Sequence, residues 1–216
     1  MQLVQGLSQI KIKLLAMAML AEDMVDRSVK ALLEGDAAMA HQVCEDDDQL
    51  DQLEEEVDEL AVQILAAGFE LEELRAITSS MKISNDIERI GDEAGTIAKS
   101  VIHLNQRSNW KAPFRKEIVA MGEKACLLLR EAIQAYSEND KSKAQQLISQ
   151  DDQMDSLNKF YQEELVRMMQ DDPEAILNYL DLGVIVKRLE RVADHAINIA
   201  EDVLILDKAV GAPQEA

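Results

Sequence analysis

Eight acidic residues of this 216-residue chain are spaced so that their carboxylates could act together. They form four pairs, and the two acids of each pair are four residues apart. The pairs are Asp47 and Asp51, Glu88 and Asp92, Asp151 and Asp155, and Glu190 and Asp194. Residues four apart lie one turn along nearly the same face of a helix. Each pair therefore presents two carboxylates in one direction, which is an arrangement that hard metal ions bind.

These acids interrupt stripes of apolar residues that predict buried helix faces. Asp47 lies between Val43 and Leu50, at the position where the stripe requires an apolar side chain. Asp151 interrupts a second stripe in the same way, and Glu88 and Glu190 continue two others. Carboxylates on a buried face cannot remain ionised without compensation, because desolvation and like charges both oppose ionisation.

Three kinds of compensation are open: bound cations, basic partners and protonation. The nearby basic residues are Arg89, Lys187, Arg188 and Arg191. Arg89 and Arg191 each follow a key glutamate directly, about 100° around the helix, so we expect them to point elsewhere. We favour bound cations. His195 beside Asp194 is a further candidate ligand, but a lone histidine is more often a capping or surface residue. A salt-bridge network and protonated carboxyls remain the alternatives.

Six long helices are predicted to position these acids. Helix breakers and capping residues divide the chain, and the longest break is 105–113. Asp172 and Pro173 are typical of an N-cap and the first helical position. The predicted helices span about 5–34, 36–66, 70–105, 113–137, 140–170 and 173–208.

The two halves of the chain repeat one another. Residues 88–101 align without gaps on residues 190–203, with seven of fourteen positions identical, and Asp47-x-x-x-Asp51 has its counterpart in Asp151-x-x-x-Asp155. Short connections make consecutive helices antiparallel neighbours. The sequence therefore predicts an all-α protein of two tandem homologous antiparallel three-helix bundles, residues 1–107 and 108–216.

The antiparallel arrangement also predicts which acids lie level. Asp47 with Asp92 and Asp51 with Glu88 share one mean residue number, which falls beside Gly68. The four acids of the second half behave in the same way around Asp172 and Pro173. We therefore expect two four-carboxylate clusters, one in each bundle.

Composition narrows the classes of function. The net charge of −20 argues against binding nucleic acid or bare anionic lipid. Cys44 and Cys126 form no C-x-x-C pair, so neither a disulfide framework nor a thiolate metal site is predicted. The apolar run 14–21 follows a helical stripe that continues beyond it, which favours a core helix over a signal peptide. No apolar run reaches the roughly 20 residues that span a bilayer, and we expect a cytoplasmic protein.

The duplicated motifs resemble those of the PhoU family of phosphate-transport regulators. Residues 82–94, KISNDIERIGDEA, are similar to the family's first signature, and residues 188–201, RLERVADHAINIAE, to its second. One departure is Ala193, where the family often has glycine. The resemblance extends over residues 7–208.

The resemblance implies two side-by-side three-helix bundles and a non-catalytic regulator of phosphate uptake and phosphate-starvation signalling. Such a protein links a phosphate-specific ABC transporter to a membrane sensor histidine kinase, and meets the membrane only through these partners. The resemblance also implies multinuclear metal sites at the eight acids, with iron, manganese, magnesium, calcium or zinc as candidate ions, and a possible homodimer.

The main alternative is a ferritin-like carboxylate-bridged metal enzyme or a metal-storage protein. That class uses Glu-x-x-His on two helices, and this sequence contains no such motif. A plain helical scaffold would explain the apolar stripes but not the matched acids. Nothing in the sequence indicates a nucleophile elbow or a phosphate-binding glycine loop.

Overall fold

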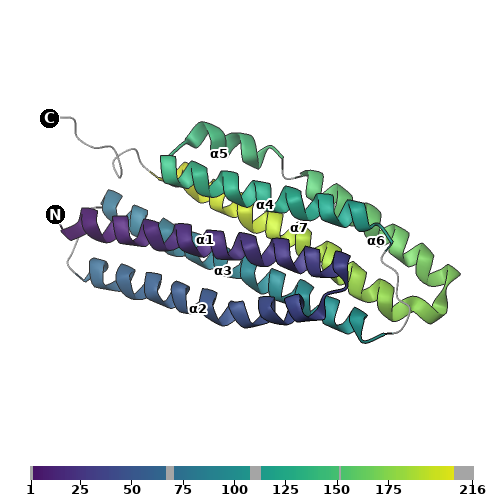
Figure 1. Ribbon diagram of the computed structural model, residues 1–216. Coiled ribbons are helices and arrows are strands. Elements are labelled where there is room, and N and C mark those ends of the chain that lie inside the picture. Colours follow the sequence, from purple (N-terminus) through teal and green to yellow (C-terminus); the bar gives the residue numbers. More distant parts are fainter. Residues whose placement is uncertain (1, 67–70, 108–112, 151, 207–216) are drawn as a thin grey trace.

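A computed structural model describes residues 2–66, 71–107, 113–150 and 152–206 (Figure 1). The described chain is almost entirely helical, as predicted. Its elements are α1 (Gln2–Glu34), α2 (Ala37–Leu65), α3 (Leu71–Asn105), α4 (Arg115–Glu138), α5 (Lys141–Ile148), α6 (Asp152–Asp171), the 3-10 turn η1 (Pro173–Ala175) and α7 (Ile176–Ile205). The predicted breaks at Gly68 and Trp110 lie outside the described residues.

Equivalent turns begin the second helix of each repeat. Gly35, with φ of 68°, ends α1, and Asp36 accepts a hydrogen bond from the Met39 amide at 3.0 Å. Asn139, with φ of 52°, ends α4, and Asp140 caps α5 through the Lys143 amide at the same distance. Glycine and asparagine tolerate the left-handed conformation best. The two repeats therefore share this turn, a left-handed residue followed by a capping aspartate, as well as their helices.

The predicted fifth helix is divided, which corrects the sequence prediction. It consists of α5 and α6, with a tight turn at Ser149 and Gln150 between them. The Ser149 hydroxyl donates to the Gln146 carbonyl at 2.7 Å, and the Gln150 amide donates to the Leu147 carbonyl at 2.9 Å. Serine and aspartate side chains compete for backbone groups in this way and interrupt helices.

The start of the last helix was only partly predicted. Pro173 occupies the first position of the 3-10 turn η1, which leads into α7. The Asp172 side chain makes no capping hydrogen bond, so its predicted role as a side-chain cap is wrong. The 3-10 turn, rather than the aspartate, provides the entry into α7.

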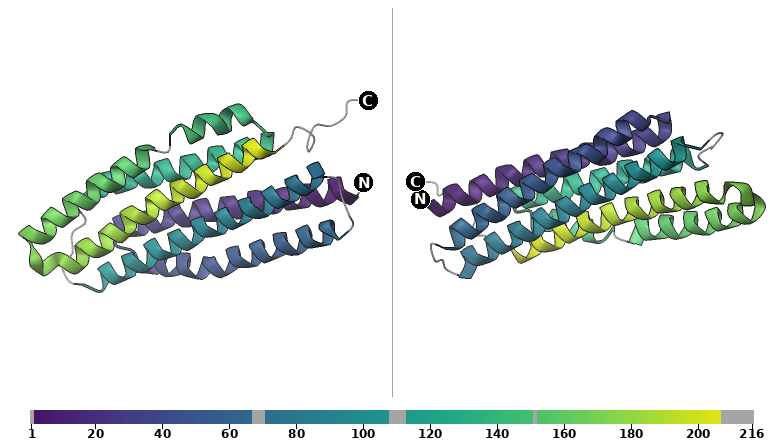
Figure 2. Two further views of the ribbon diagram at one scale, coloured as in Figure 1. Left: turned by 180° about the vertical axis from the view of Figure 1, so that it is seen from behind. Right: turned by 90° about the horizontal axis from the view of Figure 1, so that it is seen from below.

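Four helices form the centre of the molecule and two segments lie at its edges. Helices α1, α3, α4 and α7 pack together, with α3 against α7 and α1 against α4. Figure 2 shows α2 along one edge and α5 with α6 along the other, so that α2, α3, α7 and α6 form one continuous face. The described acids of the four pairs lie on the helices of this face.

One apolar core extends through both repeats. It includes Leu14, Met17 and Ala21, whose side chains are fully buried. The apolar run 14–21 is therefore part of a core helix, as the sequence indicated. Within the described ranges, no helix combines the length and hydrophobicity needed to cross a bilayer.

Candidate metal centres

Contacts across both hairpins have the register that the sequence predicted. The Cys44 thiol lies 3.8 Å from the Gly95 carbonyl oxygen, and the Asn85 amide donates to Glu54 at 3.3 Å. Both pairs have the same mean residue number as Asp47 with Asp92. In the second hairpin, the Gln162 amide donates to the Gly183 carbonyl at 2.7 Å, in the register expected for Asp155 with Glu190.

The first cluster lies between α2 and α3. Asp47, Glu88 and Asp92 are half-buried, whereas Asp51 is exposed. Burial, followed by the charges of Asp92 and Asp51, raises the pKa of Asp47. Gly95 borders Asp47 so closely that a β-carbon there would lie 3.4 Å from an Asp47 carboxylate oxygen. The four acids thus share one electrostatic environment between the two helices.

Glu88 is the acid whose negative charge is most clearly left without full compensation. Burial, with the Asp92 charge as the next cause, raises its pKa to about 7. Its Oε2 atom is buried and has no hydrogen-bond partner. The nearest cation is the Arg89 guanidinium, whose Nε lies 3.5 Å from this oxygen.

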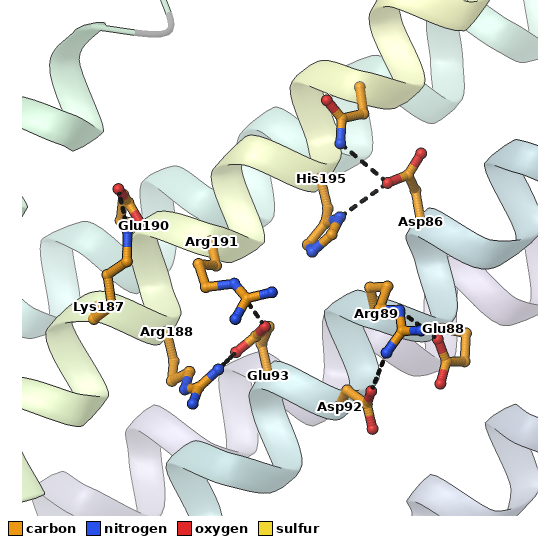
Figure 3. Close-up of polar contacts among 11 residues, drawn as sticks. Asp86, Glu88, Arg89, Asp92, Glu93, Lys187, Arg188, Glu190, Arg191 and His195 are labelled. Carbon is orange, nitrogen blue, oxygen red and sulfur yellow. Dashed lines mark hydrogen bonds and ion pairs between the residues drawn. The ribbon is translucent and has the colours of Figure 1, made fainter.

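Arg89 contradicts the expectation that it points away from the acids. Its Nη1 lies 3.2 Å from Asp92 Oδ2, in addition to the longer contact with Glu88 (Figure 3). The arginine side chain is long enough to fold back along its own helix toward a residue three positions on. The prediction was correct for Arg191, which contacts Glu93 of α3 instead of Glu190.

The second cluster lies between α6 and α7. One carboxylate oxygen each from Asp155, Glu190 and Asp194 lie within 4.8 Å of one another. Glu190 is buried, Asp194 is half-buried and Asp155 is exposed. The fourth predicted member, Asp151, lies outside the described residues. Three of the four predicted acids therefore converge.

A lysine neutralises the centre of this second cluster. Lys187 Nζ donates to both Glu190 oxygens, at 2.7 and 2.5 Å (Figure 3). Lys187 is one of the basic residues that lie near these acids in the sequence. Lys187 pairs with Glu190 and Arg89 pairs with Asp92, so ion pairing, the first alternative to bound cations, is present at both clusters. It is incomplete at Glu88, where one buried oxygen has no hydrogen bond.

Sequence reasoning missed a band of ion pairs that joins α3 to α7 between the clusters. Glu93 of α3 is buried. Its Oε2 atom accepts a hydrogen bond from Arg188 at 2.9 Å, and its Oε1 atom contacts Arg191 at 3.0 Å. Nearby, His195 Nδ1 lies 2.9 Å from Asp86 (Figure 3). His195 thus pairs with α3 through Nδ1, and it is not among the side chains that converge around Glu190.

The duplication contained a signal for this band. In the alignment of the two halves, Glu93 corresponds to His195, and Asp86 corresponds to Arg188. The pairs Glu93 with Arg188 and His195 with Asp86 therefore occupy equivalent places, with the basic residue exchanged. Reciprocal pairing of this kind is expected where two repeats meet across a pseudo-twofold axis.

The donor chemistry of both clusters fits hard cations. All described ligand candidates are carboxylates, the ligand type that magnesium, calcium, manganese and iron prefer over thiolate sites. The buried Glu88 oxygen without a hydrogen bond is the kind of atom that a bound cation would satisfy.

Glu88 should make the metal-free protein less stable as the pH rises. With a folded-state pKa near 7 against an ordinary value of 4.5, the folded chain binds more protons than the unfolded chain between these values. The free energy of unfolding should therefore fall through this window, by about 1 kcal/mol, because solvent reaches part of the side chain. Glu88→Gln, which stays neutral, should remove this fall.

Urea unfolding of EDTA-treated protein at several pH values measures this effect. Glu59→Gln, which removes a carboxylate from the exposed side of α2, is the matched control. An unchanged pH dependence in Glu88→Gln would show that Glu88 ionises without penalty.

Fold and site together define a class: a duplicated all-helical bundle with carboxylate clusters between its outer and inner helices. The sequence profile of the PhoU domain matches residues 14–101 and again residues 118–203. The chain belongs to the PhoU family.

Several relatives support this membership. The phosphate-specific transport system accessory protein PhoU homolog of Pseudomonas aeruginosa is 37% identical over 201 residues, 93% of this chain and 83% of the relative. The homolog of Clostridium acetobutylicum is 31% identical over 202 residues, 93% and 91% of the two chains.

Solved structures agree with the sequence comparison. The crystal structure of PhoU from Pseudomonas aeruginosa matches with a TM-score of 0.89 at 36% identity, over 94% of this chain and 97% of that chain. The phosphate transport system regulatory protein PhoU from Streptococcus pneumoniae matches with a TM-score of 0.88 at 25% identity, over 98% and 100%. The tandem architecture is thus that of the family, and a role as an accessory protein of phosphate transport follows from the membership.

Proposed function

We propose that this protein is a non-catalytic cytoplasmic adaptor between a phosphate-specific ABC transporter and a membrane sensor histidine kinase. Its role would be to regulate phosphate uptake and to restrain the phosphate-starvation response. Support comes from the relatives, which are named accessory or regulatory proteins of phosphate transport. The acidic chain would suit partner surfaces rich in lysine and arginine, as cytoplasmic loops of membrane proteins are.

The proposal includes one metal site in each of two repeats, residues 1–107 and 108–216. Asp47, Asp51, Glu88 and Asp92 would hold cations in the first repeat, and Asp151, Asp155, Glu190 and Asp194 in the second. Iron, manganese, magnesium, calcium and zinc are the candidate ions. Such ions would neutralise the carboxylates and cross-link helices, which is a structural or sensing role.

An exposed apolar stripe on α7 carries the proposal that the protein docks on a partner. Leu177, Leu180 and Val184 leave 60%, 50% and 36% of their surface exposed. The equivalent positions of α3 are also exposed, but they are occupied by Arg75, Thr78 and Lys82. The shared fold therefore does not require apolar residues there, and clustered exposed aliphatic side chains are typical of interaction sites.

Charging this stripe should weaken partner binding while the fold remains intact. We expect Leu177→Glu with Leu180→Glu to weaken binding to the transporter at least tenfold, because buried apolar contacts would be replaced by desolvated charges. Flotation of the protein with vesicles that contain or lack the organism's phosphate transporter measures the effect.

Thr78→Glu is the matched control for Leu180→Glu, because it adds the same charge at the equivalent position of the first repeat. Full binding by the charged-stripe variant would exclude this face as the docking site. A change in sedimentation of the free protein would instead assign the stripe to a homodimer.

A further inference from the structure

The two acidic clusters differ in the cation that the chain itself supplies. Lys187 donates to both oxygens of Glu190, which is 7% exposed at its side chain. The position equivalent to Lys187 in the first repeat is Asn85, and it bonds Glu54 rather than Glu88. An ammonium group therefore saturates the central glutamate of one cluster only.

The first cluster has two weaker internal counter-ions: Lys99, which acts on Asp47 through its charge, and Arg89, which lies beside Glu88. Arg89 approaches Glu88 Oε2 at 3.5 Å, which leaves that buried oxygen without a hydrogen bond. The Arg89 side chain is 49% exposed and follows Glu88 directly. Movement of its guanidinium into solvent breaks the 3.2 Å contact with Asp92 but no bidentate contact with Glu88.

We propose that Lys187 acts as a built-in competitor for cations at the second cluster, so that the two sites fill at different metal concentrations. This inference rests on the proposed metal binding. A divalent cation that binds Glu190 must displace the Lys187 ammonium from both oxygens, whereas one that binds Glu88 meets an oxygen already free of hydrogen bonds. The displaced lysine, 48% exposed, then stays nearby as a repelling charge.

The consequence is a protein with a high-affinity and a low-affinity site built from the same motif. The first cluster would remain loaded, and the second would respond to changes in cation supply. Lys187 determines this difference by its charge and position, without itself serving as a ligand.

Titration of the EDTA-treated full-length protein with manganese(II), with free ion measured by electron paramagnetic resonance, tests the inference. We expect two classes of site whose affinities differ by about tenfold or more, a factor typical of one close charge pair in partly buried surroundings. Glu88→Gln should remove the tight class, and Glu190→Gln should remove the weak class.

Lys187→Asn, which installs the residue of the first repeat, should strengthen the weak class about tenfold and leave the tight class unchanged. Lys116→Asn, on an exposed position of α4, controls for the change in net charge. Lys187→Met provides a second neutral variant, should the first fail to fold as judged by circular dichroism.

The outcomes separate the two proposals. If wild-type protein binds manganese at both clusters with equal affinity, or if neither neutral Lys187 variant alters the weak class, the competitor role is overturned and the metal sites stand. If no variant binds manganese at either cluster, the proposed metal function fails and this inference fails with it.

Discussion

Replacing Arg188 and Arg191 together with alanine should lower the free energy of unfolding by about 3–5 kcal/mol. Both guanidinium groups contact Glu93, whose side chain is only 4% exposed. Without them, Glu93 would be a buried carboxylate with neither of its cationic partners, which is among the costliest changes a folded protein can sustain.

Removal of Glu93 instead of the two arginines should lower the free energy of unfolding much less. Arg188 and Arg191 are 31% and 41% exposed at their side chains, so water can solvate both once Glu93 is removed. We expect Glu93→Ala to lower the free energy of unfolding by only about 1–2 kcal/mol. Adding Glu93→Met to the double arginine variant should restore most of the lost stability, because no buried charge then remains.

Urea unfolding at constant salt measures all four proteins, and equal m-values would show that the unfolded states are comparable. Equal losses for the Glu93 variant and the double arginine variant would show that Glu93 is not desolvated in solution. The difference between the stability losses of these two variants is therefore more informative than either loss alone.

This band of ion pairs connects α3 and α7, and each of these helices carries one of the acidic pairs. Glu93 follows Asp92 directly, and Arg188 and Arg191 lie on either side of Glu190. A shift of α3 against α7 would disturb the band and would move one cluster relative to the other, because each cluster lies within its own hairpin. The band thus stabilises the relative position of the two clusters.

Much of the fold was predictable because the same sequence motifs occur in both halves of the chain. The apolar stripes identified the helices, and the paired motifs fixed the hairpin register that Cys44 and Gly95 now show. The predicted starts of the second helices, near residues 36 and 140, lie where Asp36 caps α2 and Asp140 caps α5. The convergence of Asp155, Glu190 and Asp194 followed from the same register.

The remaining features depend on side-chain conformation and on contacts between repeats. Arg89 folds back along its helix, which residue spacing alone does not reveal. The break between α5 and α6 results from local competition by Ser149 for a backbone carbonyl. The contact between α3 and α7 is tertiary, so Glu93 could be recognised only from the exchanged charges of the two halves.

Gly91→Ala should lower the free energy of unfolding by about 2 kcal/mol, although alanine favours helices. A β-carbon at Gly91 would lie 2.2 Å from Leu50 Cδ2 and 3.6 Å from Met24 Cε, both in the fully buried core. Overpacking of this kind costs about 1–3 kcal/mol, and the gain in helix propensity of up to about 1 kcal/mol offsets only part of it.

The second repeat suggests a compensating substitution. Ala193 is equivalent to Gly91, and buried Met154 is equivalent to Leu50. Methionine is unbranched and adapts to irregular space better than leucine does. We therefore expect Leu50→Met to restore about 1 kcal/mol in the Gly91→Ala background, with a coupling energy measurable by a double-mutant cycle.

Gly95→Ala is the matched control on the same helix face. Its β-carbon would lie 3.4 Å from the nearest atom, an Asp47 oxygen, which is ordinary contact, so this variant should be as stable as wild type or slightly more so. Thermal and urea unfolding of the wild type, Gly91→Ala, Leu50→Met and the double variant would measure the double-mutant cycle. A Gly91→Ala protein as stable as Gly95→Ala would mean that Leu50 moves aside freely, and that Ala193 in the second repeat needs no methionine opposite it.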